Sequence, residues 1–384
     1  MLTTFAIAGY RSIRKLAIDL APLTIITGAN GSGKSSLYRA LKLLADVAQG
    51  RLISSIAQEG GLDSTLWAGP EKFSEAMKRG EVKVEGIVRK HPIALQLGFT
   101  SDDYGYAIDL GLPESGRIFS RDPAIKSEAM WVGQSARPST MVAERRGPLV
   151  RLRSEAHGDW VDRMSSLSDV ESMMGWCADP QAGLELLQLR ERMRGWRFYD
   201  NLRTDRDAPA RRQQIATYTP VLAGDGSDIS AAITTIHAIG DADGFEDAIG
   251  DAFPGASVKG HGDGHGGITM HQPGLLRPLQ ADELSDGTLR YIMLAAALLS
   301  PRPPELLVIN EPESSLHPSL IAPLARLIRR AGQHSQIIIV SHNQQLVDAL
   351  AAFEDAVLYR LGKSLGETVL ENADQAMWKW PIER

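Results

Sequence analysis

The chain has 384 residues, a formal net charge of −6 at pH 7, 43% hydrophobic residues, 23% charged residues and one cysteine. This length allows one large domain or two of ordinary size, and the composition is typical of a globular protein. A single cysteine excludes an internal disulfide framework, and the absence of any run of ~20 apolar residues argues against a spanning helix. We therefore expect a cytoplasmic protein, and the negative charge does not by itself indicate nucleic-acid binding.

Apolar runs over 2–8, 16–20 and 23–26 predict three strands near the N-terminus. The third run leads into the sequence Gly28-Ala29-Asn30-Gly31-Ser32-Gly33-Lys34-Ser35, which fits the pattern G-x-x-x-x-G-K-[ST]. Apolar residues then recur at helical spacing over 36–47, so strand, glycine loop and helix follow one another as a phosphate-binding loop requires.

Backbone N–H groups of such a loop bind a polyphosphate. We expect Lys34 to reach the β- and γ-phosphates and the Ser35 hydroxyl to bind Mg²⁺. The nucleotide-binding residues expected in this segment are Gly28, Asn30, Gly31, Ser32, Gly33, Lys34, Ser35 and Ser36.

The next segment alternates strand-like runs with short turn sequences. Runs over 82–88, 93–100 and 104–110 predict an antiparallel meander, which a plain parallel β/α domain would not contain. Residues 113–214 contain few β-branched runs, several tryptophans and a helical stretch over 181–194. We expect this part to be a mostly helical insertion without long coiled-coil arms, which divides the chain into segments 1–112, 113–214 and 215–384.

The last segment alternates helices with buried strands. Helices are expected over 227–253, 284–300 and 319–331, and the first places four isoleucines on one face: Ile229, Ile233, Ile236 and Ile239. Continuous apolar strands over 306–309 and 337–340 predict a parallel sheet covered on both faces, to which the strand before Gly28 would also belong. The fold class is therefore α/β.

Polar side chains follow both of these strands, where ligands bind in such sheets. Glu311 is the candidate general base or water-positioning group, and His342 is a candidate sensor of the γ-phosphate. Asn310 stands where an aspartate that holds a Mg²⁺-bound water is expected, although its amide carbonyl can still accept from that water. Weaker metal binding and a shifted role for Glu313 both remain open.

The stretch Leu284-Ser285-Asp286-Gly287 opens an apolar helix. Serine and glycine at a helix start form an anion site from exposed N–H groups and a hydroxyl, although a simple N-cap is the alternative interpretation.

In this order the motifs resemble those of ABC-type ATPase heads of the RecF/SMC/OLD group, in particular the bacterial "AAA family" ATPases within it. The opening Phe5-Ala6-Ile7-Ala8-Gly9-Tyr10-Arg11-Ser12 resembles the first strand and arginine-bearing turn of that group. The resemblance covers residues 1–110 and 215–384. The chain ends too soon after His342 for a nuclease domain of the OLD type.

The resemblance implies a P-loop head that dimerises head-to-tail on ATP and Mg²⁺. It implies that Ser285 and Gly287 contact the γ-phosphate held by the other subunit, that Arg11 approaches the phosphates, and that His342 is a switch residue. Two departures are Asn310 and Leu316-His317, where transporters have leucine-aspartate. The Mg²⁺-sensing glutamine has only weak candidates, Gln58 and Gln96.

Other features leave alternatives open. Two arginine-rich runs, 145–153 and 190–212, suit DNA, a protein partner or a purely structural role. Four residues are weak metal candidates, because the glycines around them favour a mobile loop instead: His261, Asp263, His265 and His271. We expect Trp378 and Trp380 to dock the C-terminal tail onto the head, and Cys177 to be buried.

The sequence thus predicts a cytoplasmic Mg²⁺-dependent ATPase that acts as a nucleotide-driven dimeric switch in DNA-related or defence processes. The main alternative is an ATP-gated scaffold with little hydrolysis that regulates a protein partner. A P-loop kinase is disfavoured by the Ser285–Arg290 motif and by the order of Glu311 and His342, and a transporter subunit by the arginine turn and the insertion.

Overall fold

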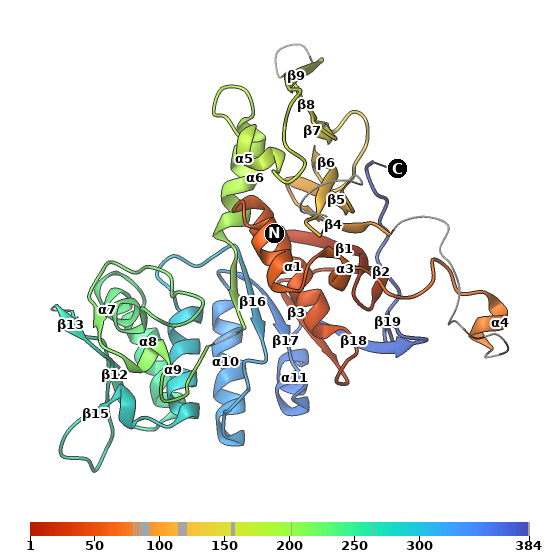
Figure 1. Ribbon diagram of the computed structural model, residues 1–384. Helices are drawn as coiled ribbons and strands as arrows, with labels where there is room; N and C mark the ends of the chain where they lie inside the picture. Colours follow the sequence, from red (N-terminus) through yellow and green to blue (C-terminus); the bar gives the residue numbers. More distant parts are fainter. Residues whose placement is uncertain are drawn as a thin grey trace. The chain divides into compact units, whose positions relative to one another are not determined.

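The structure is a computed structural model that describes residues 1–384 except 80, 82, 84–92, 114–120, 155–157, 201, 263 and 383–384. The chain forms two compact units (Figure 1). Unit 1 comprises residues 1–21, 28–195 and 359–384, whereas unit 2 comprises 22–27 and 196–358. These bounds differ from the three segments expected from the sequence, because the insertion is shared between the two units.

Unit 1 is built on an antiparallel sheet with the strand order β2-β1-β4-β5-β6-β7-β8-β9, counted over the described residues. Its strands are β1 (Leu2–Tyr10), β2 (Ile13–Asp19), β4 (Leu95–Ser101), β5 (Tyr104–Gly111), β6 (Ala124–Val132), β7 (Met141–Arg146), β8 (Leu149–Arg153) and β9 (Trp160–Met164). The antiparallel meander is therefore confirmed where it is described. The strand expected over 82–88 lies, apart from Lys83, outside the described residues.

The prediction of a mostly helical insertion is wrong for the described part of 113–214. Four strands, β6 to β9, extend the sheet, and the only α-helices among the described residues of this part are α5 (Met173–Trp176) and α6 (Leu184–Gly195). The sequence was misleading because β6 is buried on both faces along most of its length, so apolar and polar residues do not alternate, and only Ile125 and Val132 among its 9 residues are β-branched. Pairing with the neighbouring strands overrides these local preferences.

Helix α1 (Lys34–Ala48) follows the phosphate loop, as predicted, and buries a leucine-rich face in unit 1. It packs against α6, β1, β4 and α2 (Leu52–Gln58). Two single-turn helices, α3 (Leu62–Thr65) and α4 (Glu75–Lys78), complete the described helices of this unit.

A buried charged network joins the sheet of unit 1 to the segment before α5. Glu128 on β6 and Arg145 on β7 are both fully buried and form an ion pair of 3.0 Å. The Glu128 carboxylate also accepts hydrogen bonds from the Tyr106 hydroxyl at 2.6 Å and from the backbone N–H of Met173 at 2.9 Å. Arg145 donates to the carbonyl of Ser168 at 2.8 Å. These partners offset part of the cost of burying two charged side chains.

The C-terminal segment forms a hairpin of β18 (Ala356–Ser364) and β19 (Glu367–Leu370), whose residues from Tyr359 onward belong to unit 1. A tail then crosses the sheet, where the Trp378 ring lies 6.1 Å from that of Trp131 and 5.3 Å from that of Trp380. The predicted docking of the tail on the head is confirmed, and Cys177 is buried as expected.

Unit 2 contains the predicted parallel sheet, with β10 (Arg197–Tyr199), β16 (Leu306–Asn310), β17 (Gln336–Val340) and β3 (Leu23–Gly28) as consecutive neighbours. The residues of β3 up to Thr27 belong to this unit. One face is covered by a core drawn from five helices, namely α7 (Ile229–Ile239), α8 (Ala242–Ala252), α9 (Asp286–Leu298), α10 (Ile321–Ala331) and α11 (Gln344–Ala351).

The helix expected over 227–253 is two helices in the structure. Gly240 ends α7, and the Asp241 side chain caps α8 by accepting from the N–H of Gly244 at 2.9 Å. Ile229, Ile233 and Ile236 are buried as predicted, but Ile239 is 57% exposed because it lies at the break.

Short elements complete unit 2. They are β11 (Gln214–Ile215), β12 (Ser257–Lys259), β13 (His265–Gly266), β14 (Thr269–His271), β15 (Leu279–Gln280) and the 3₁₀ turns η1 (Pro209–Arg211), η2 (Ala281–Glu283) and η3 (Pro318–Leu320). Across the described parts of both units, none of the helices has the length and apolar character needed to cross a membrane.

Candidate nucleotide site

The phosphate loop begins where β3 ends and closes at the first turn of α1. Gly31 and Gly33 have φ angles of 77° and 111°, which only glycine adopts without strain. A Cβ on Gly28 would lie 2.2 Å from the carbonyl oxygen of Leu361, and one on Gly33 would lie 2.2 Å from the Thr368 hydroxyl. The glycines are therefore required both by the backbone turn and by the β18–β19 hairpin behind the loop.

The groups that would meet phosphate lie at the N-terminus of α1. Asn30, Gly31 and Ser35 are exposed, and no side chain caps the helix, so its first turn suits an anion. The Lys34 ammonium donates to the carbonyls of Gly28 at 2.6 Å and Ala29 at 3.0 Å, which places its charge over the loop.

Thr368 holds the loop from behind and was not predicted from the sequence. It is fully buried, and its hydroxyl donates to the carbonyl of Ser32 at 2.8 Å. The same oxygen lies 2.8 Å from the Ser12 hydroxyl, and the Thr368 N–H donates to the carbonyl of Ser12 at 2.7 Å. The β1–β2 turn and the phosphate loop, 20 residues apart, are thus joined through one side chain near the C-terminus.

Arg11, which the resemblance places near the phosphates, is held by a carboxylate in this structure. Its guanidinium donates to Glu59 at 2.5 Å and 3.0 Å, and the Tyr10 hydroxyl donates to the same carboxylate at 2.6 Å. Burial lowers the pKa of Arg11, but the hydrogen bonds to Glu59 and Tyr10 outweigh it and the pKa is raised. The residue itself has a φ of 50°, a strained conformation often found at functional positions.

In unit 2, β16 ends at Asn310 and Glu311 follows it directly, as the sequence predicted. Glu311 has a φ of 50°, and its backbone is fixed on two sides. Its N–H donates to the carbonyl of Val340 at 2.7 Å, and its carbonyl accepts from the guanidinium of Arg290 at 3.0 Å. The strained turn aims a carboxylate that is 42% exposed, which suits a group that must reach water.

The histidine turn after β17 meets this carboxylate. Nδ1 of His342 lies 3.3 Å from one oxygen of Glu311 and 3.6 Å from one oxygen of Glu313. Glu313 is nearly buried and accepts from the Ser341 hydroxyl at 2.7 Å and from the N–H groups of His342 and Asn343 at 3.3 Å. The structure therefore brings Asn310, Glu311 and His342 together at one edge of the sheet, with Glu313 behind them.

The segment over 284–287 begins α9 with an N-cap, which was the alternative interpretation of this stretch. The exposed Ser285 hydroxyl accepts from the N–H of Thr288 at 3.1 Å, and Asp286 begins α9. A Cβ on Gly287 would lie 2.7 Å from the carbonyl of Ser315, so this position also needs glycine.

Arg211 braces this segment, a role that the sequence did not suggest. Its guanidinium donates to the carbonyls of Ala281 at 2.7 Å and Leu284 at 2.8 Å, and to the carboxylate of Asp286 at 2.7 Å. The Arg211 side chain is only 8% exposed.

Most of the described arginines in the two runs are paired with carboxylates or buried. In the run over 145–153, Arg145 is fully buried, Arg151 pairs with Glu144, and Arg153 donates to carbonyls. In the second run, ion pairs involve Arg190, Arg192, Arg194, Arg203 and Arg211. The structural alternative is therefore favoured for most of these arginines.

The remaining candidates lie on separate elements. Gln58 is exposed at the end of α2, whereas Gln96 on β4 donates to Asp109 at 3.3 Å. His265 and His271 belong to β13 and β14, and Asp263 lies outside the described residues. Among the residues that the structure describes, no cluster of three or more His, Cys, Asp or Glu side chains suits a metal ion.

The chain resembles solved SMC head domains. It matches the SMC head domain from Thermotoga maritima at 16% identity and a TM-score of 0.49, with 97% of this chain and 99% of that chain covered. An SMC head bound to the C-terminal domain of ScpA, derived from Pyrococcus furiosus, matches at 13% identity and a TM-score of 0.51, with 96% and 95% covered. The second of these matches supports an SMC-head-like α/β fold, and at 13% identity it concerns the fold alone.

Two comparisons of the amino-acid sequence find a short match to one protein and a long match to a family model. The peptide transport system ATP-binding protein SapD of Salmonella typhimurium is 37% identical over 71 residues, which are 18% of this chain and 21% of that protein. The family model described as "AAA domain, putative AbiEii toxin, Type IV TA system" matches residues 23–348. Because that match spans most of the chain, from the strand before the phosphate loop to the helix after His342, the protein belongs to this AAA-domain family.

Proposed function

We propose that the protein binds ATP with Mg²⁺ and hydrolyses it to ADP and phosphate. The observation that carries this proposal is the pairing of β3, which leads into the phosphate loop, with β17, which leads into the histidine turn next to Glu311. In parallel sheets, ligands bind beyond the carboxyl ends of adjacent strands. The proposed arrangement therefore has the loop and Glu311 acting on one nucleotide.

Each of these residues would have a separate role in phosphoryl transfer. Lys34 and the N–H groups of the loop would hold the phosphates, Glu311 would orient and deprotonate the attacking water, and His342 would respond to the γ-phosphate. The exposed Ser35 hydroxyl and the Asn310 carbonyl are oxygen donors of the kind that Mg²⁺ prefers, so they fit its requirements. When bound, Mg²⁺ would neutralise charge on the phosphates.

We further propose that two copies close on ATP as a cytoplasmic switch. The exposed start of α9, with Ser285 and Gly287, would complete the site of the second copy. One similar SMC head is bound to ScpA, so we expect either a protein partner or DNA as the partner of this chain. The process that it would serve is expected to be DNA-related or defensive.

An ATP-gated scaffold with little hydrolysis is the second candidate. It is favoured by Asn310, because a neutral amide holds a metal-bound water less firmly than a carboxylate. Tight ATP binding with very slow turnover would identify it.

The deciding experiment is steady-state phosphate release from ATP and Mg²⁺ by the intact protein and by Glu311→Gln, with and without DNA. Light scattering with and without ATP tests dimer formation, and Ser285→Arg serves as the variant that blocks closure. Turnover that Glu311→Gln abolishes supports the ATPase. ATP binding without turnover in the intact protein supports the scaffold, and absence of ATP binding refutes both.

A further inference from the structure

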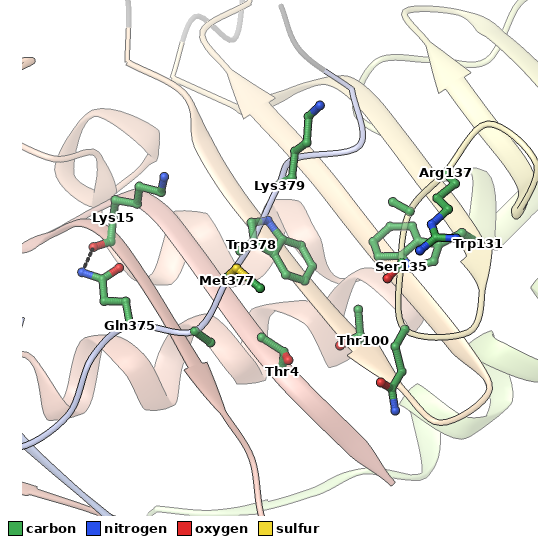
Figure 2. A pocket seen from close by; sticks show the side chains of 13 residues that line it. Thr4, Lys15, Thr100, Trp131, Ser135, Arg137, Gln375, Met377, Trp378 and Lys379 are labelled. Atoms are coloured by element: carbon green, nitrogen blue, oxygen red, sulfur yellow. Dashed lines mark hydrogen bonds between the residues drawn. The ribbon is translucent and has the colours of Figure 1, made fainter.

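A groove of about 700 Å³ lies in unit 1 between the C-terminal tail and one face of the sheet (Figure 2). Its walls come from the first two strands, β4, β6, the turn after β6, and the tail over 375–379. This volume falls in the range of pockets that hold small organic ligands, roughly 300–1,000 Å³. Neither the phosphate loop nor the edge that carries Glu311 lines it.

Positive side chains predominate around the groove, where one carboxylate, that of Asp19, accepts from the lining hydroxyl of Thr4 at 2.9 Å. Lys15, Arg137 and Lys379 are exposed and come from three different elements, and the described lining includes neither aspartate nor glutamate. None of the three forms an ion pair with another residue that the structure describes. They differ in this respect from the arginines of the two runs, most of which are paired or buried. Cations held on several sides of a groove favour a ligand with more than one negative charge.

An aromatic ring, the indole of Trp378, lines the groove where the tail lies on the sheet. Small residues align across four strands, with Ala6, Gly98, Ala107 and Ala129 as successive register partners. A Cβ on Gly98 would lie 2.5 Å from the Trp378 ring, so the indole rests directly against this strand. Figure 2 shows this indole over the sheet, between Lys15 and Arg137. An indole supported in this way can stack with a planar ring.

The polar side chains among these walls add hydrogen-bonding capacity. Gln134, Ser135 and Gln375 line the same groove as the cations and the indole. Amide and hydroxyl groups of this kind can fix the orientation of a polar heterocycle. The lining thus offers stacking, hydrogen bonding and anion binding within one cavity.

We propose that this groove binds a nucleotide, with the base against Trp378 and the phosphates on Lys15, Arg137 and Lys379. The same chemistry is presented by a free mononucleotide or dinucleotide and by a single-stranded nucleic acid. The groove is separate from the residues assigned to ATP hydrolysis, so this proposal does not rest on the ATPase.

Binding is tested with a fluorescein-labelled hexathymidylate, measured by anisotropy without ATP or Mg²⁺, in protein that carries Lys34→Ala to disable the phosphate loop. The groove variant combines Lys15→Ala, Arg137→Ala and Lys379→Ala. Its matched control combines Arg146→Ala, Lys259→Ala and Lys363→Ala, which removes three exposed cations that do not line the groove. Trp378→Ala and Trp378→Phe test stacking, and circular dichroism of each variant checks folding.

We expect the groove variant to weaken binding by roughly tenfold or more and to flatten its salt dependence, whereas the control changes it by less than about threefold. Trp378→Ala should weaken binding by about fivefold or more, with partial recovery in Trp378→Phe. Competition by AMP or by the dinucleotide pApA at similar affinity assigns a free nucleotide, whereas competition only by longer strands assigns a nucleic acid. No binding of any probe, or equal losses in the groove and control variants, overturns the proposal.

Discussion

Arg211→Ala is predicted to damage turnover while leaving ATP binding intact. Arg211 donates to the carbonyls of Ala281 and Leu284 and to the carboxylate of Asp286, and so fixes the segment that precedes α9. Ser285, in the middle of that segment, is proposed to serve the nucleotide of a second copy. Loss of the Arg211 hydrogen bonds should therefore lower the turnover of the closed dimer without changing ATP binding by a single copy.

The contacts of Arg211 set the size of the effect. A hydrogen bond from a charged donor contributes roughly 1.5–3 kcal/mol, and several bonds to one group are not additive. The pair with Asp286 adds little, because that carboxylate is 60% exposed and solvent screens it. We therefore expect the segment to lose on the order of 3 kcal/mol, which shifts its local equilibrium by roughly 100-fold. A displaced Ser285 should lower kcat by about tenfold to a hundredfold.

The assay compares phosphate release and equilibrium ATP binding for Arg211→Ala and for Arg203→Ala. Arg203 is a matched control, because it also pairs with an aspartate but is 45% exposed. We expect kcat to fall only in Arg211→Ala, with ATP affinity within about twofold of the native value in both. Unchanged turnover in Arg211→Ala, or an equal fall in Arg203→Ala, would refute this reasoning.

Three further predictions concern other contacts. Thr368→Val should weaken ATP binding by about tenfold in a fluorescent-nucleotide titration, because the carbonyl of Ser32 loses a buried donor, whereas Thr368→Ser should bind normally. Glu128→Ala should destabilise unit 1 by about 3–5 kcal/mol in urea unfolding, since it strands the fully buried charge of Arg145. The hydrogen bond from Arg277 lowers the pKa of Glu283 from 4.5 to about 2. The ionised Glu283 therefore contributes fully to the stability of the folded state above pH 4.5, and this contribution is lost as the pH falls toward 2. In an NMR titration, Arg277→Ala should return that pKa toward 4.5, and an unchanged value would contradict the assignment.

The features that were predicted correctly from the sequence depend on residues that lie close together along the chain. The phosphate loop, the cap at Ser285 and the polar ends of β16 and β17 are all encoded within short stretches, where glycine, caps and apolar runs have fixed meanings. The structure places these elements as expected. Their catalytic roles remain predictions, because they depend on a bound nucleotide.

Features that depend on distant contacts were not predicted. Thr368 reaches Ser32 from 336 positions away, and Arg211 reaches Asp286 from 75 positions away, without a local signal in either case. The same limit explains the arginine runs. A list of basic residues does not reveal that Arg145 has a buried carboxylate partner whereas Lys15 lines an exposed groove.

The position of Glu313 bears on the substitution at Asn310. The sequence left open whether Glu313 replaces the missing carboxylate as a metal ligand. In the structure one oxygen of Glu313 accepts from Ser341 and from the backbone of His342, and the other oxygen is buried, so the carboxylate does not reach solvent. We propose that its charge fixes the turn that places His342 against Glu311, and that this constrained geometry would orient water even if Asn310 held a metal weakly. Glu313→Gln should then lower turnover more than it raises the Mg²⁺ concentration needed for half-maximal activity, and the reverse result would make Glu313 a metal ligand.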